Sequence, residues 1–150
     1  MQALNHVAFG TLIALTIKQP VLVAPLALSS HFFLDILPHY GEDPKAPKNS
    51  APYHFRILID GLASLLFIAL SSSTFPEYMP VILVGSFFAI LPDFFWPAAL
   101  FIKSDNPLWK FLKFHKRIQK FESRRGIYVE VGWFSIISII IINFFSALKI

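Results

Sequence analysis

Histidine and aspartate occur in this chain at a spacing that suits a metal ion. His31 and Asp35 are four residues apart, so on a helix both side chains lie on one face. Imidazole nitrogen and carboxylate oxygen are ligands for zinc, manganese and magnesium. Such an ion lowers the pKa of a bound water, which then supplies hydroxide for hydrolysis near neutral pH. Because the sequence has no cysteine, nitrogen and oxygen must hold any metal.

Further candidates come from distant parts of the chain. Pro38 and Pro92 each end a helix in this interpretation, because proline removes an amide donor and disfavours helical geometry in the preceding residue. His39 and Asp93 would then lie on turns, free to approach the same ion. We predict metal binding by His6, His31, Asp35, His39 and Asp93, and catalytic roles for His115 and Asp60. Several imidazoles favour zinc, with manganese or magnesium as the second choice.

Five apolar segments must position these residues: 4–17, 21–37, 54–72, 80–102 and 127–148. The mean hydropathy is +0.61, and most charges lie outside the segments. Both features are typical of an integral membrane protein. We predict an all-α, polytopic membrane helix bundle with about five transmembrane helices, in a single domain over residues 1–150. The first segment is about 21 Å long as a helix, shorter than the roughly 30 Å hydrocarbon core.

The basic residues are distributed unequally between the two membrane faces. Alternate threading of the segments places most of them on one face: Lys45, Lys48, Arg56, Lys103, Lys110, Lys113, Lys116, Arg117, Lys120, Arg124 and Arg125. Only Lys18 and Lys149 fall on the other face. The positive-inside rule makes the basic face cytoplasmic, and the candidate ligands lie on this side. The net charge of +4 therefore indicates topology and attraction to anionic lipids, and we expect no nucleic-acid partner.

Residues 107–121 predict an interfacial amphipathic helix. Asn106 can cap this helix and Pro107 suits its first position. Its apolar residues recur at helical spacing, and lysines occupy much of the remaining surface. His115 shares the apolar face, so the helix could cover the site and deliver this imidazole. Lys116 and Arg117 could bind a substrate phosphate, although a plain topology anchor explains the lysines equally well.

A short internal repeat relates two parts of the chain, residues 5–40 and 59–94. Aligning 36–39, Ile-Leu-Pro-His, with 90–93, Ile-Leu-Pro-Asp, also aligns His6 with Asp60. Two helical hairpins would then present equivalent polar positions. The repeat predicts a pseudo-symmetric site between the hairpins.

Several motifs resemble a family of small bacterial membrane proteins, the inner-membrane-associated metal-dependent hydrolases. The motifs are Asn5-His6, the run Leu28-Ser-Ser-His-Phe-Phe-Leu-Asp-Ile-Leu-Pro-His39, Leu91-Pro92-Asp93 and Phe114-His115-Lys116-Arg117. The resemblance implies a metal-dependent phosphoester or lipid hydrolase in the bacterial inner membrane. It also implies metal or catalytic roles for His6, His31, Asp35, Asp93 and His115.

The sequence departs from this family pattern at three points. The Leu-Pro-Asp turn follows the Ser-His-x-x-x-Asp helix, whereas the family order is the reverse. Phe95 stands where an acid is expected, and Gln119 stands where a second histidine is expected. These departures leave open a single-metal site or an inactive relative.

Three functions are compatible with these residues. The first is a metal-dependent hydrolase that acts on a lipid-like or phosphoester substrate at the cytoplasmic face. The second is a bundle that passes ions or protons without catalysis, which would need a polar path to the opposite face. The third is a structural bundle in which histidines and acids only pair with one another.

Overall fold

The computed structural model describes residues 1–41, 51–98, 106–145 and 147. The helices are α1 (Ala3–Ile17), α2 (Pro20–Ile36), α3 (Ala51–Thr74), α4 (Met79–Ile90), α5 (Phe95–Ala98), α6 (Pro107–Ile118) and α7 (Gly126–Ile140). Two 3-10 helices, η1 (Pro76–Tyr78) and η2 (Leu91–Phe94), and a π-helical segment, η3 (Ile141–Phe145), extend them. Strands β1 (His39–Tyr40) and β2 (Glu122–Ser123) form one parallel pair. The predicted all-α class is confirmed.

Three helical stretches are long and apolar enough to cross a membrane: Ala51–Thr74, Pro76–Phe94 and Gly126–Asn143. Helices α1 and α2 are apolar but shorter. The prediction of about five spans is therefore confirmed for three by length and composition. The predicted ends of the fourth and fifth segments, residues 102 and 148, lie outside the described residues. Four of the basic residues used to assign the topology also lie outside them: Lys45, Lys48, Lys103 and Lys149.

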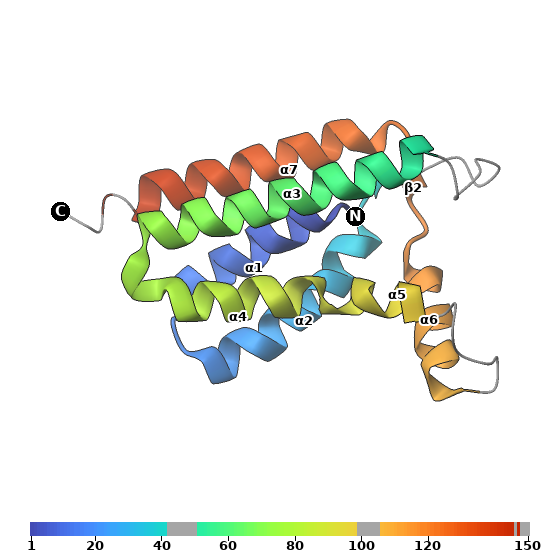
Figure 1. Cartoon of the computed structure of the whole chain (residues 1–150), viewed down its shortest axis with the longest axis horizontal. Coiled ribbons are helices and arrows are strands. Elements are labelled where there is room, and N and C mark those ends of the chain that lie inside the picture. Colours follow the sequence, from blue (N-terminus) through green and yellow to red (C-terminus); the bar gives the residue numbers. More distant parts are fainter. Residues whose placement is uncertain (42–50, 99–105, 146, 148–150) are drawn as a thin grey trace.

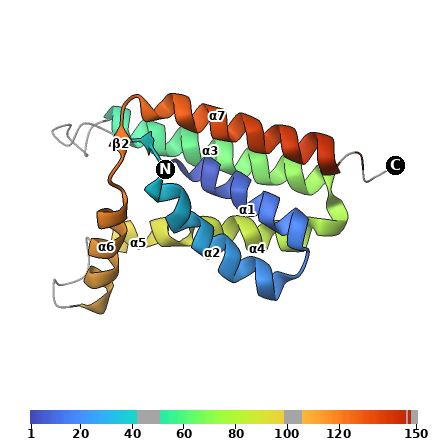
Figure 2. The same ribbon diagram turned by 180° about the vertical axis from the view of Figure 1, so that it is seen from behind.

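Helix α1 is the central helix of the bundle. Figures 1 and 2 show it between a layer formed by α3 and α7 and a layer formed by α2 and α4, and it contacts all four. Its buried residues point in several directions, among them Val7, Ala8, Thr11 and Leu15. A helix that is apolar on every side is stable only when neighbours surround it. Its amino-terminal end carries His6 into the interior of the bundle, where the exposed fraction of His6 is 0%.

Two glycines bring α1 and α4 together. A Cβ added at Gly10 would lie 2.4 Å from the carbonyl oxygen of Gly85, and a Cβ at Gly85 would lie equally close to the Gly10 carbonyl oxygen. Small residues at such a crossing let helix backbones approach closely. One residue beyond each glycine, the hydroxyls of Thr11 and Ser86 lie 3.2 Å apart and form a hydrogen bond. The crossing fixes the position of α4 relative to α1.

The helix ends follow the local sequence. Lys18 adopts a left-handed conformation with φ of 62°, and its amide donates to the Ala14 carbonyl, which ends α1. Helix α2 ends at Ile36, because Pro38 keeps Leu37 extended. Pro92 lies in η2, a 3-10 helix that leads directly into α5, so the chain changes helix type at Pro92 and does not leave the helix for a turn as predicted. His39 therefore follows the end of α2, and Asp93 lies in the 3-10 helix after α4.

Helix α6 lies across one end of the bundle. Figures 1 and 2 show it running crosswise to α3, α4 and α7. The Asn106 side chain accepts a hydrogen bond from the Leu108 amide and Pro107 opens the helix, which confirms the predicted cap. The helix ends at Ile118, three residues before the predicted end. Beyond it, β2 pairs with β1, which ties the chain after α6 to the chain after α2.

Candidate metal centre

A cluster of histidine and aspartate side chains lies where α1, α2, η2 and α6 meet. Two groups in the cluster each have ligand atoms within 4.8 Å of one another: His6, His31 and Asp93, and His31, Asp35 and His115. Asp93 is one-third exposed, and the side chains of the other members are fully buried. Five of the predicted residues therefore meet, although they come from four separate elements.

The tighter group consists of His31, Asp35 and His115. The two Nε2 atoms lie 3.0 Å apart. The Asp35 Oδ2 atom is 3.3 Å from the Nε2 atom of His31 and 2.7 Å from that of His115. Adjacent ligands of an ion bound at about 2.0–2.1 Å lie roughly 2.9–3.4 Å apart. The three atoms thus have nearly the spacing that one divalent ion requires.

A backbone carbonyl fixes the tautomer of His31. Its Nδ1 atom lies 2.7 Å from the Ala89 carbonyl oxygen, which can only accept, so Nδ1 carries the hydrogen. In the neutral ring, Nε2 then presents its lone pair to Asp35 and His115. Histidine ligands of metals usually have such a partner on the second ring nitrogen. The sequence gives no signal for this contact, because any residue supplies a carbonyl.

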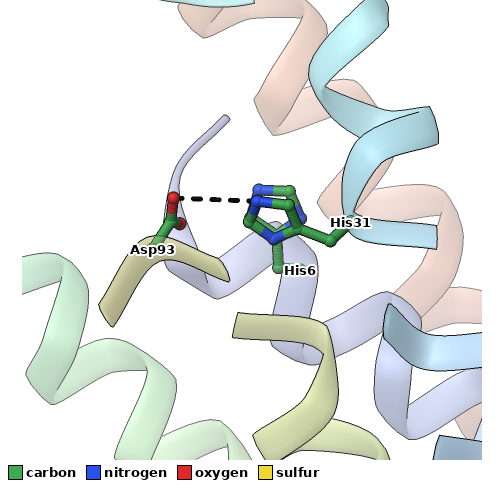
Figure 3. A group of neighbouring side chains, drawn as sticks. All are labelled: His6, His31 and Asp93. Carbon is green, nitrogen blue, oxygen red and sulfur yellow. Dashed lines mark ion pairs between the residues drawn. The ribbon is translucent and has the colours of Figure 1, made fainter. Parts of the chain in front are cut away.

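His6 and Asp93 form the second side of the cluster. Figure 3 shows the His6 and His31 rings stacked, with the Asp93 carboxylate facing them; the ring centroids are 4.0 Å apart and the planes differ by 19°. The Asp93 Oδ1 atom lies 3.7 Å from the His31 Nε2 atom. The Nδ1 atom of His6 has no hydrogen-bond partner among the described residues, and its Nε2 atom lies 3.3 Å from the Asp35 Oδ1 atom without a well-aligned hydrogen bond. Buried nitrogens of this kind are rare without a ligand, so the donor set fits a cation.

Asp35 is the most heavily engaged acid of the cluster. Its Oδ1 atom accepts from the Met1 amine at 2.6 Å and lies 3.3 Å from the His6 Nε2 atom. Its Oδ2 atom accepts from Gln119 at 3.1 Å as well as facing His115. Gln119 therefore enters the site at the position where the family resemblance implied a histidine. Its spacing of four residues from His115 was the signal that could have identified it.

His39 lies outside the cluster, although we predicted it as a ligand. Its Nδ1 atom is 2.7 Å from the Leu37 carbonyl oxygen, and its Nε2 atom is 3.6 Å from the Glu122 Oε1 atom. The β1–β2 pairing places His39 directly opposite Glu122. This contact with the His39 ring holds the pKa of the Glu122 carboxyl below its usual range. His39 therefore belongs to the junction between the two strands.

Asp60 and Glu130 hold the start of α1. Asp60 accepts from the amides of Ala3 and Leu4, at 2.8 and 3.1 Å. These amides have no partner within α1, so a carboxylate is favourable there. Glu130 of α7 is 1% exposed. It accepts from the Gln2 and Tyr40 amides and from the Asn5 side chain. Both acids thus position the helix that carries His6.

Lys116 and Arg117, the predicted phosphate ligands, are exposed on α6. Their neighbour His115 is buried, so the three consecutive residues lie on different sides of the helix. Both cations therefore lie on the surface of the helix that brings His115 to the cluster.

None of the protein-family models, curated proteins or solved structures compared with this chain matches it.

Proposed function

We propose that the chain is a membrane-embedded, metal-dependent hydrolase of a lipid-like or phosphoester substrate. The observation that carries the proposal is the arrangement of His31, Asp35 and His115, with the His31 tautomer set by a backbone carbonyl. Two imidazoles and one carboxylate leave positions free for water and substrate, as in catalytic zinc sites. Zinc is the first choice of ion, and manganese or magnesium the second.

Each residue then has a distinct role. The bound ion would supply a polarised water as nucleophile. His31, Asp35 and His115 hold the ion, and Gln119 orients the Asp35 carboxylate. Asp93 is the partly exposed member of the cluster, so its carboxylate is placed to accept a proton from water entering there. Lys116 and Arg117 attract a substrate phosphate from the surface, in accordance with their exposed positions.

The membrane placement is part of the proposal. Helices α1 and α2 would lie in the bilayer with the three longer helices and complete the five predicted segments. Because α1 is short, its amino-terminal end and the cluster would lie below the headgroups rather than in bulk water. A lipid could then reach the cluster from the side, at the cytoplasmic face of a bacterial inner membrane.

An activity assay tests the hydrolase. Purified protein in lipid nanodiscs is loaded with zinc and offered phospholipids, and released phosphate, headgroup and fatty acid are measured. We expect turnover that falls more than about 100-fold in His115→Asn, because even supporting residues of metal sites contribute about 10–100-fold. His54→Asn, on an exposed position of α3, is the control. Equal turnover in wild type and His115→Asn would refute the assigned role.

One observation favours a structural bundle as the second candidate. His115 Nε2 and Asp35 Oδ2, 2.7 Å apart, are close enough for a charge-assisted hydrogen bond without any ion. In that case alanine at His31 or Asp35 lowers stability, and zinc changes the stability of neither the wild type nor these variants. A zinc-dependent rise in the thermal midpoint of wild type alone would exclude this reading.

A further inference from the structure

Helix α6 carries a face of basic side chains that no acid of the helix neutralises. The residues Lys110, Lys113, Lys116 and Arg117 are exposed on it, and Lys120 is exposed just beyond its end. The helix itself, Pro107–Ile118, contains no acidic residue. We call these five side chains the cationic face. A partner with closely spaced negative charges would complement it.

The opposite face of α6 contacts the bundle through few side chains. Leu112 and His115 are its fully buried residues. Phe32 of α2 packs against Phe111 and Phe114, with ring centroids 6.1 and 5.8 Å apart. Phe95 and Trp96 of α5 pack against Phe111 and His115, with ring centroids 5.4 and 5.6 Å apart. The polar contacts of His115 and Gln119 with Asp35 add to this junction. Packing of α6 against the bundle therefore also brings His115 and Gln119 to Asp35 and completes the cluster.

The orientation of α6 identifies the partner. The helix lies crosswise to the long apolar helices, so it runs roughly parallel to the plane of a membrane that they cross (Figures 1 and 2). Phe114 is 52% exposed and Phe121 is 57% exposed beside the lysines. Exposed aromatic rings next to basic side chains are typical of helices at the headgroup level. Anionic phospholipid headgroups are the negative charges available at that depth.

We propose that anionic phospholipid headgroups bind the cationic face of α6 and thereby hold His115 and Gln119 at Asp35. The consequence for metal binding rests on the proposed function, whereas the lipid contact does not. With α6 undocked, the tighter group retains only His31 and Asp35, and an ion loses one of its three ligands. Anionic lipid and metal ion would therefore each increase the affinity for the other, because both favour docked α6.

The test compares nanodiscs of phosphatidylcholine alone with nanodiscs that also contain phosphatidylglycerol. Hydrogen exchange of the α6 amides measures docking without any metal, and competition with a chromophoric chelator measures the zinc affinity. The variant is Lys110→Gln/Lys113→Gln, which leaves Lys116 and Arg117 in place. Its control, Arg124→Gln/Arg125→Gln, removes the same charge from exposed positions outside α6. Both measurements are made at low ionic strength, where screening is weak.

We expect phosphatidylglycerol to slow exchange in α6 and to strengthen zinc binding. Each lysine near an anionic surface contributes about 5-fold to the affinity for that surface. The double variant should therefore reduce the effect of phosphatidylglycerol on α6 exchange and on zinc affinity by up to about 25-fold. The control should keep most of it. Equal α6 exchange in both lipids would overturn the inference. Lipid-dependent exchange in a protein that binds no zinc would support the lipid contact and overturn the proposed function instead.

Discussion

Replacing Asp35 with asparagine is the most informative single change at the cluster. The substitution keeps the size of the side chain and removes its charge. Both carboxylate oxygens of Asp35 face donors, since Oδ1 accepts from the Met1 amine and Oδ2 accepts from Gln119. Either orientation of the asparagine amide therefore places its NH₂ group against another donor. The Asp35 side chain is fully buried, so bulk water does not relieve that contact.

The size of the effect follows from the contacts that Asp35 makes. Breaking a buried charge pair by altering one partner costs about 3–5 kcal/mol. For a chain of this length, about 3 kcal/mol lowers the thermal midpoint by roughly 6–12 °C. Zinc at 100 times its dissociation constant should stabilise wild type by about 2.7 kcal/mol. Asp35→Asn should lose this increment as well, because it removes the only acid of the tighter group.

Thermal unfolding of detergent-purified protein, with and without zinc, measures both effects. Asp60→Asn is the matched control, because Asp60 accepts from the first amides of α1 and lies outside the cluster. We expect this control to lose about 1–2 kcal/mol, as for a lost helix cap, and to keep the zinc-dependent shift. A zinc-dependent shift that survives in Asp35→Asn would refute the assignment of the ligands.

Three further predictions concern the surroundings of the cluster. Gly85→Val should lower the free energy of unfolding by about 1–3 kcal/mol or more, as measured by thermal unfolding, because its Cβ would collide with the Gly10 carbonyl. The control, Gly61→Val, places its side chain in open space and should be tolerated. The pKa of Glu122 is lower in the folded state than its unfolded-state value of about 4.5, so its ionised form stabilises the fold at pH values above 4.5. This stabilisation is lost as the pH falls through the folded-state pKa. Glu122→Gln should therefore be less stable than wild type at neutral pH and equal to it in strong acid, and parallel curves would contradict this reasoning. His39→Asn should keep the zinc-dependent rise in the thermal midpoint that wild type shows. Loss of that rise in the variant would make His39 a metal ligand after all.

The sequence was sufficient for those features that depend on local chemistry. Apolar segments, proline positions and the spacing of His31 and Asp35 predicted the helices, the end of α2 and the shared helical face. The alternation of segments across a membrane also predicted that His6, Asp93 and His115 would meet. These inferences need only helix geometry and the direction of each segment.

The remaining features depend on contacts that no local pattern encodes. The Ala89 carbonyl became the partner of His31 because α2 packs against α4, a helix far from it in the sequence. His39 was drawn away from the cluster by the pairing of β1 with β2, two strands too short for a sequence signal. Asp60 was predicted as a catalytic residue, whereas its carboxylate accepts hydrogen bonds from the first amides of α1. The internal repeat of residues 5–40 and 59–94 stays a prediction.

The metal content of the purified protein tests the central claim most directly. Elemental analysis by mass spectrometry would count the ions bound to wild type, His31→Ala and His115→Ala after exposure to zinc and manganese. We predict close to one zinc or manganese ion for each wild-type chain, and loss of that ion from both variants. A well-folded wild-type protein that remains free of metal after both ions are offered would contradict the account.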